Sequence, residues 1–294
     1  MKSIKEVFTG CATALVTPFT ESGVDYKSLG ALIDWQIEMG ADALVILGTT
    51  GESATIDEYE RRELISFARE RINKRAPMIV GTGSNSTKRT QNFTYDAEKY
   101  GADGILAVTP YYNKASISGL IQHYKSVAEA TTLPVILYNV PSRTGLDMGT
   151  PTLEGLYDTK NIVAVKEASG SVTRSARILS AFGDRYTVYS GCDELILPIL
   201  SIGGKGVISA VSNIVPSEIS TLCREFFKGN IKESAKIQLS LYRLIEEMFA
   251  EVNPIPVKTA LSLMGKCTDT FRLPMCKSTR KGQIEAVLKE YKLL

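Results

Sequence analysis

Lys166 directly follows the apolar run of residues 162–165, which reads I-V-A-V. A short run rich in β-branched residues and bounded by polar ones is typical of a strand buried in a parallel sheet. A lysine at the carboxyl end of such a strand lies where α/β folds place their reactive groups. Apolar surroundings disfavour the charged form of an amine, and only the uncharged amine attacks a carbonyl. Lys166 is therefore the candidate nucleophile, and the plain alternative is a lysine that extends its ammonium into solvent.

Hydroxyl, phenol and guanidinium groups follow other apolar runs in the same way: Thr49, Thr50, Tyr111, Tyr112, Tyr138 and Arg143. If Lys166 forms an iminium with a ketone, the neighbouring carbon loses a proton, and Tyr138 is predicted to move that proton. A carboxylate on the substrate needs donors, which Arg143 and the backbone of the 48–53 turn can supply. Each group alone also fits a tight turn, a packed aromatic pair or a surface arginine. Together they favour covalent amine catalysis on a carboxylated carbonyl compound.

These side chains need a scaffold that brings strand ends together. Strand-like runs alternate with helical patterns, and eight strands are predicted: residues 12–16, 43–47, 78–80, 104–108, 135–138, 162–166, 186–189 and 206–209. Eight βα units in succession favour a (β/α)8 TIM barrel, in which all strand ends share one rim. The alternative, an open doubly wound sheet, would carry a dinucleotide fingerprint after its first strand, and none is there.

After about residue 230 the strand signals stop. Apolar residues at helical spacing run over 237–248 and again over 284–291. We therefore expect a barrel over residues 1–229 that carries the active site, and a C-terminal helical extension over residues 230–294. Between the strands, Asp57 with Glu60 three residues later predicts a capping box at the start of a helix.

The composition argues against several other classes of protein. The 34 basic and 32 acidic side chains give a net charge of +2, so no surface for nucleic acid or anionic membranes is expected. No stretch approaches the roughly 18 apolar residues of a membrane span. With His123 as the single histidine, a histidine-rich metal site is not expected, and the residues after the strands include no metal ligands. No cofactor is expected either. The five scattered cysteines indicate free thiols in a cytoplasmic protein.

Four motifs together resemble those of one known family. They are G-T-T-G-E-S at 48–53, T-P-Y-Y-N at 109–113, Y-N-V-P-S-R-T-G at 138–145 and V-K-E-A-S-G at 165–170. With these motifs the chain resembles, over essentially its whole length, the dihydrodipicolinate synthases (4-hydroxy-tetrahydrodipicolinate synthases). These belong to the pyruvate-dependent class I aldolases, which include N-acetylneuraminate lyase. The resemblance implies a lyase that condenses pyruvate with L-aspartate 4-semialdehyde in diaminopimelate and lysine biosynthesis.

The resemblance also implies catalytic roles. Lys166 would form the Schiff base with pyruvate. Tyr138, Thr49 and Tyr112 would relay protons, with Tyr112 reaching into the site of a neighbouring subunit. That sharing requires at least a dimer, and the family implies a homotetramer built as a dimer of dimers.

The substrate-binding positions follow from the same resemblance. Thr50 would bind the pyruvate carboxylate, Arg143 would bind the carboxylate of aspartate semialdehyde, and Gly191 and Ile208 would line the pocket. Arg143 favours the synthase over a sialic acid lyase or another pyruvate aldolase, because the lyase accepts an uncharged amino sugar at that end. A third hypothesis, a barrel that senses an oxo acid without turnover, gives no reason for a buried amine.

A feedback site for lysine is where the sequence departs from the family. Four residues match the family's lysine-binding positions at the dimer interface: Ser53, Ala54, Asn85 and Tyr111. Three positions that hold histidines or an acidic residue in lysine-inhibited synthases hold others here: Glu58, Arg61 and Arg89. Two guanidinium groups would repel the lysine ammonium. The sequence therefore predicts weak or no inhibition by lysine.

Overall fold

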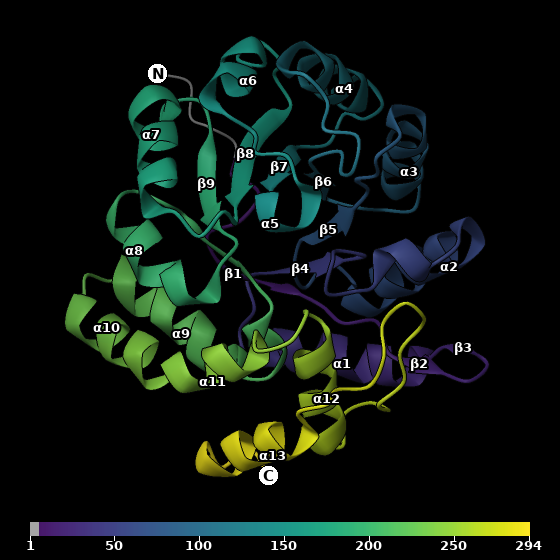
Figure 1. The fold of residues 1–294 in the computed structure, drawn as a ribbon, viewed down its shortest axis with the longest axis vertical. Coiled ribbons are helices and arrows are strands. Elements are labelled where there is room, and N and C mark those ends of the chain that lie inside the picture. Colours follow the sequence, from purple (N-terminus) through teal and green to yellow (C-terminus); the bar gives the residue numbers. More distant parts are fainter. Residues whose placement is uncertain (1–5) are drawn as a thin grey trace.

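Eight parallel strands close into a barrel in the computed structural model, which describes residues 6–294. The strands are β1 (Gly10–Ala14), β4 (Ala43–Ile46), β5 (Met78–Gly81), β6 (Gly104–Val108), β7 (Val135–Asn139), β8 (Ile162–Glu167), β9 (Thr187–Ser190) and β10 (Gly206–Ser209). Because β1 pairs with both β4 and β10, the sheet has no edge. Figure 1 shows this ring of strands with helices around it. The predicted (β/α)8 barrel is confirmed.

All eight predicted strands are present, with shifts of one or two residues at their ends. The largest shift is at the first strand, which was predicted over 12–16 and is found at Gly10–Ala14. The strand ends early because the Val16 backbone N–H donates to the side-chain oxygen of Asn213, and not to a neighbouring strand. An apolar run marks which residues are buried but not where the ladder of hydrogen bonds stops.

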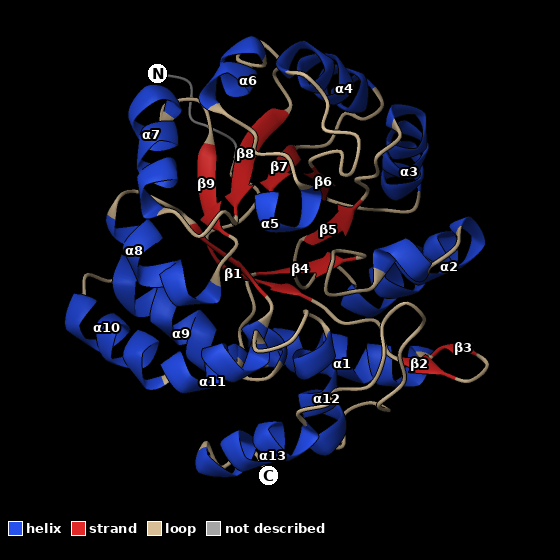
Figure 2. Ribbon diagram, in the orientation of Figure 1, coloured by secondary structure: helices blue, strands red, loops and turns tan. Residues whose placement is uncertain are grey.

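Helices connect the strands. They are α1 (Tyr26–Glu38), α2 (Glu58–Ile72), α3 (Thr87–Lys99), α4 (Ile117–Glu129), α5 (Pro141–Thr144), α6 (Thr150–Gly155), α7 (Val172–Phe182), α8 (Ile196–Ser201) and α9 (Pro216–Phe227). All but the short α5, which lies at the mouth, cover the outside of the barrel (Figure 1). The predicted capping box of Asp57 and Glu60 is present at the start of α2. A small hairpin of β2 (Phe19–Thr20) and β3 (Gly23–Val24) follows the first strand (Figure 2).

Along most of each strand, successive residues point into two different apolar cores. One core lies inside the barrel and the other lies between the barrel and its helices. In β8, Ala164 belongs to the inner core and Val165 to the outer one. Because alternate residues of a strand share a face, Lys166 points inward, at the end of the strand where the barrel opens.

The chain continues beyond the barrel as α10 (Ile231–Ser240), α11 (Tyr242–Met248), α12 (Ile255–Leu263) and α13 (Lys281–Glu290), which form the predicted helical extension (Figure 1). The helix expected over 237–248 is divided between α10 and α11 at Leu241. Helix α10 packs on α8 and α9, and α13 packs on α11 and α12. A domain boundary at residue 229 stays a prediction. Within residues 6–294, no helix is long and apolar enough to cross a membrane.

Candidate active site

Lys166 and Tyr138 are paired residues at the carboxyl ends of β8 and β7. Lys166 Nζ lies 4.3 Å from the centre of the Tyr138 ring, and each residue is only 6% exposed. None of the ion pairs among residues 6–294 involves Lys166. The amine therefore lies beside a phenol and is not held by a carboxylate, which suits a nucleophile that needs a proton donor next to it.

Thr49 and Thr50 belong to the loop after β4, whose backbone is strained at both ends. Leu47 (φ 59°) and Glu52 (φ 53°) adopt the left-handed conformation, which is uncommon for residues other than glycine. The carbonyl oxygen of Leu47 packs against Gly81 of β5, where a Cβ would lie 2.1 Å from it. Gly81 therefore makes room for a sharp turn that places both threonines at the mouth of the barrel.

Arg143 belongs to the one-turn helix α5, which follows β7. Its backbone N–H donates to Val140 O at 3.0 Å, and its guanidinium Nη2 donates to Asn253 O at 3.1 Å. Asn253 in turn donates from Nδ2 to Thr50 Oγ1 at 3.0 Å. The Arg143 side chain makes no ion pair with any of residues 6–294, so its remaining N–H groups are available to a substrate carboxylate.

Gly191 and Ile208 form the wall on the other side of Lys166. Gly191 follows β9, and its backbone N–H donates to Glu167 O at 2.8 Å. A Cβ at Gly191 would lie 3.0 Å from Lys166 Cε and 2.5 Å from the Cβ of Ala168. The position therefore requires glycine if the lysine side chain is to keep its place.

The buried Asp193 supports this wall from behind. Its carboxylate accepts hydrogen bonds from Ser209 Oγ and, at 3.2 Å, from the backbone N–H of Ala210. Burial raises the pKa of Asp193 to about 6, while these hydrogen bonds act in the opposite direction. Because Ser209 and Ala210 directly follow Ile208, Asp193 fixes the end of β10 against the cavity.

Replacing Gly191 by alanine is expected to slow Schiff-base formation with pyruvate by roughly tenfold or more, because the added methyl displaces the Lys166 side chain. The rate at which borohydride traps the pyruvate adduct measures this step. Gly282→Ala is a matched control, since a Cβ there meets nothing within 4 Å. Trapping at the wild-type rate in Gly191→Ala would show that the lysine does not need this space.

One cavity of about 370 Å³ brings together seven of the predicted residues: Thr49, Thr50, Tyr138, Arg143, Lys166, Gly191 and Ile208. Tyr112 is not part of it and is 82% exposed on this single chain. Its proposed role in a neighbouring subunit therefore stays a prediction. Among residues 6–294, no group of three or more histidine, cysteine, aspartate or glutamate side chains is placed to hold a metal ion.

The C-terminal region supplies part of the cavity wall, which sequence reasoning missed. Asn253 lines the cavity together with four residues at α11: Tyr242, Ile245, Glu246 and Phe249. The helical stripe over 237–248 predicted the helix but not which of its side chains would face the barrel. The available signal was the motif N-P-I-P-V-K at 253–258, which matches the family without indicating a role.

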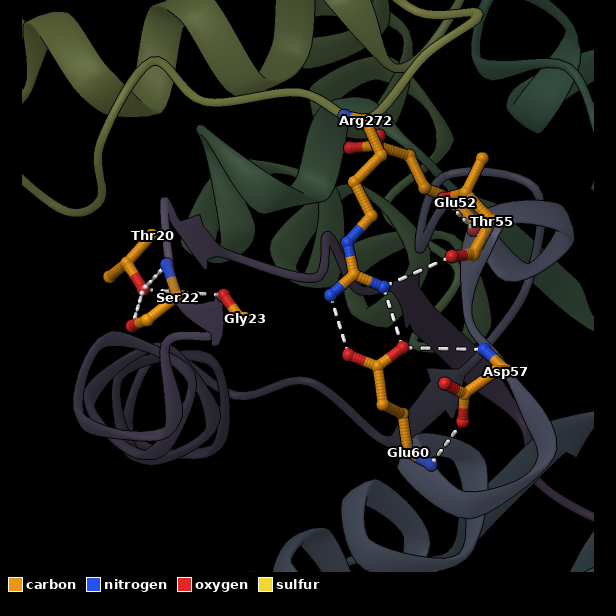
Figure 3. A network of polar contacts seen from close by, with 8 residues as sticks. All are labelled: Thr20, Ser22, Gly23, Glu52, Thr55, Asp57, Glu60 and Arg272. Carbon is orange, nitrogen blue, oxygen red and sulfur yellow. Dashed lines mark hydrogen bonds and ion pairs between the residues drawn. The ribbon is translucent and has the colours of Figure 1, made fainter.

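Two acid–base pairs anchor the C-terminal region to the segment after β4. Lys258 Nζ lies 2.7 Å from Glu52 Oε1, and both side chains are fully buried. Burial lowers the pKa of Lys258, and the Glu52 carboxylate opposes that shift. Arg272 donates to both carboxylate oxygens of Glu60, at 2.5 and 2.6 Å, and to Thr55 O at 3.0 Å (Figure 3). The segment that carries the two threonines is thus held from outside the barrel.

A second cavity, of about 650 Å³, adjoins the first, and four residues line both: Thr49, Val140, Arg143 and Asn253. Six residues singled out for lysine feedback also line it: Ser53, Ala54, Glu58, Arg61, Arg89 and Tyr111. Asn85, the remaining candidate, is exposed and is not among the lining residues. The candidate effector cavity is therefore next to the catalytic one.

A parallel (β/α)8 barrel with an amine and a phenol side by side in one cavity is the arrangement expected of a Schiff-base-forming lyase of the aldolase type. Comparison with known proteins gives the family. The sequence model of the dihydrodipicolinate synthetase family matches residues 7–290, and the chain belongs to that family.

Individual relatives match along their whole length. A 4-hydroxy-tetrahydrodipicolinate synthase of Acetivibrio thermocellus is 47% identical over 292 residues, which cover 99% of each chain. The crystal structure of dihydrodipicolinate synthase from Thermotoga maritima has a TM-score of 0.95 at 43% identity and covers 98% of this chain and 100% of its own. The structure of the enzyme from Cyanidioschyzon merolae with lysine bound has a TM-score of 0.94 at 39% identity, and the match covers 99% of this chain and 100% of that one. The similarity includes the C-terminal helices as well as the barrel.

Proposed function

We propose that the chain condenses pyruvate with L-aspartate 4-semialdehyde to give 4-hydroxy-tetrahydrodipicolinate, through a Schiff base on Lys166, in diaminopimelate and lysine biosynthesis. One observation carries the proposal: the Lys166 amine lies beside the Tyr138 phenol in a cavity that also holds Thr50 and Arg143. The two substrates each bring one carboxylate, and Thr50 and Arg143 are separate donors for them.

The chemical steps follow from these groups. Lys166 Nζ adds to the keto carbon of pyruvate, and water leaves as the iminium forms. The methyl carbon of the bound pyruvate then loses a proton, and the resulting enamine attacks the aldehyde carbon of the second substrate. The amino group of the adduct adds to the iminium carbon, which closes the ring and releases Lys166. Tyr138 and Thr49 carry the protons, since both line the cavity around the amine.

Reduction with borohydride in the presence of pyruvate tests the proposal. The expected result is a pyruvate adduct located at Lys166 by mass spectrometry, together with pyruvate turnover when aspartate semialdehyde is the second substrate. Turnover only with N-acetylmannosamine would select the sialic acid lyase. The absence of an adduct at Lys166 would remove both aldolase assignments and leave an oxo-acid sensor.

Replacing Arg143 by alanine is expected to raise the KM for aspartate semialdehyde by about tenfold to a hundredfold, because a charge-assisted bidentate contact is lost. The borohydride-trapped pyruvate adduct should form as in the wild type. Arg143→Lys keeps the charge without the planar fork, so its KM for aspartate semialdehyde should lie between those of the wild type and of Arg143→Ala. Equal loss of adduct formation and of aldehyde use would contradict the assigned role.

We further propose that the chain acts as a homotetramer, a dimer of dimers, in the cytoplasm. The support for an interface is Tyr112, a large aromatic side chain in the loop after β6 that is 82% exposed on the single chain. In a dimer, Tyr112 would complete the proton relay of the partner's site. The support for the compartment is that all five cysteines are unpaired, as in proteins of a reducing environment.

Lysine is expected to inhibit weakly or not at all. Arg61 is buried in the wall of the second cavity, where its guanidinium lies 4.1 Å from the centre of the Phe93 ring and donates to Gly81 O at 2.5 Å. This fixed positive charge disfavours an ammonium entering the cavity. Steady-state inhibition by L-lysine measures the effect. An inhibition constant below the millimolar range would contradict the prediction.

A further inference from the structure

Asn253 connects the two groups that are proposed to bind the substrate carboxylates. Its side-chain Nδ2 donates to Thr50 Oγ1 at 3.0 Å, and its main-chain oxygen accepts from Arg143 Nη2 at 3.1 Å. Both contacts are made by a residue that is 6% exposed and lines both cavities. Asn253 follows α11, so it approaches the mouth of the barrel from outside the barrel fold.

The direction of the hydrogen bond determines what Thr50 can do. The amide Nδ2 of asparagine is only a donor, so Thr50 Oγ1 must be the acceptor. A hydroxyl has one proton, and Thr50 donates it to none of residues 6–294. The proton of Thr50 therefore remains available, in the cavity that contains Lys166, for donation to an anion such as the pyruvate carboxylate.

The same residue has a feature that a purely structural role does not explain. The amide oxygen Oδ1 of Asn253 is buried, and it has no hydrogen-bond partner among the described residues. An unsatisfied buried acceptor lowers stability, and the hydrogen bond from Nδ2 to Thr50 is what the amide gains in return. What the amide adds at this position is the donor that faces Thr50.

We propose that Asn253 is a positioning residue for substrate binding: its side chain orients the Thr50 hydroxyl as a donor to the pyruvate carboxylate, and its main-chain oxygen holds Arg143 beside it. The proposal rests on the function proposed above for Thr50 and Arg143. Because the two contacts use different atoms of Asn253, a side-chain substitution removes the first and keeps the second. The two substrates should therefore respond differently.

Asn253→Ala tests this separation in the full-length enzyme. The KM for pyruvate is expected to rise about tenfold, the change that corresponds to one lost hydrogen bond, with kcat within about twofold of the wild type. The KM for aspartate semialdehyde should change less, and the thermal midpoint should stay close to that of the wild type. Asn253→Ser, which is polar but too short to reach Thr50, should behave like Asn253→Ala and replaces it if the alanine variant does not fold.

Two comparisons separate a positioning role from packing. Asn253→Asp keeps the volume but can only accept, so it takes the Thr50 proton and should raise the pyruvate KM more than alanine does. The double variant Thr50→Val with Asn253→Ala should have the pyruvate KM of Thr50→Val alone, because Asn253 acts through that hydroxyl. The proposal would be overturned by an unchanged pyruvate KM in Asn253→Ala, or by a smaller rise in Asn253→Asp than in Asn253→Ala. It would also be overturned if the pyruvate KM of the double variant rose by the product of the two single effects. If the wild type forms no adduct at Lys166, the proposed function fails instead.

Discussion

A Lys166→Met variant is expected to lose the borohydride-trapped pyruvate adduct and to turn over at least about 10³-fold more slowly than the wild type. No other amine is described in the cavity that could take over the attack, because Lys166 is the single lysine among its lining residues. Methionine has nearly the same length and no charge, so it fills the inward-facing position at the end of β8. Adduct mass and steady-state turnover measure the two losses.

The stability of this variant distinguishes loss of chemistry from loss of fold. Lys166 is 6% exposed and makes no ion pair with any described residue, so its replacement by methionine removes no buried partner. The thermal midpoint is therefore expected to be equal to that of the wild type or higher. Lys160→Met, at an exposed lysine just before the same strand, is the matched control and should retain full activity. A variant that still forms the adduct would show that another amine is the nucleophile.

Lys258→Met should produce the largest loss of stability, about 3–5 kcal/mol at neutral pH, because it leaves the Glu52 carboxylate buried without its cation. Denaturant unfolding at neutral pH measures this loss. The pyruvate KM should also rise, because Glu52 ends the loop that carries Thr49 and Thr50.

The double variant Glu52→Gln with Lys258→Met tests the cause. With both charges removed, much of the lost stability should return, since replacement of a whole buried pair is often close to neutral. Arg280→Met is the matched control, because Arg280 pairs with Glu247 in a partly exposed position where an ion pair contributes little. If the free energy of unfolding of Lys258→Met were within about 1 kcal/mol of the wild-type value, the Glu52 carboxylate would have found another partner.

Sequence patterns were sufficient to predict the barrel and to identify the residues that follow its strands. Lys166, Tyr138 and Thr49 could be grouped from the sequence alone because strand ends of a parallel barrel share one rim, whatever their separation along the chain. The resemblance to the family added a role for Gly191 and Ile208 as lining residues. The structure gives the reason for the first, since a Cβ there would lie 2.5 Å from the Cβ of Ala168 and 3.0 Å from Lys166 Cε. The strand boundaries were accurate to one or two residues.

Contacts between distant segments could not be predicted from patterns. Asn253 and Thr50 are 203 residues apart, and Lys258 and Glu52 are 206 apart, and nothing in either local sequence indicates its partner. A buried lysine and a solvated one look alike in sequence, so Lys258 was placed in a motif but given no ion pair. The role of Tyr112 depends on a second chain, which a pattern in one chain does not position.

The contribution of α11 to the cavity bears on how the substrate preference of such an enzyme can evolve. Tyr242, Glu246 and Phe249 line the cavity but are exposed, so substitutions there disturb no packed core. The strand that carries Lys166, in contrast, is buried along its whole length and tolerates little change. Selection for a new aldehyde, in nature or in a directed-evolution library, can therefore act on this helix while the chemistry of the barrel stays intact.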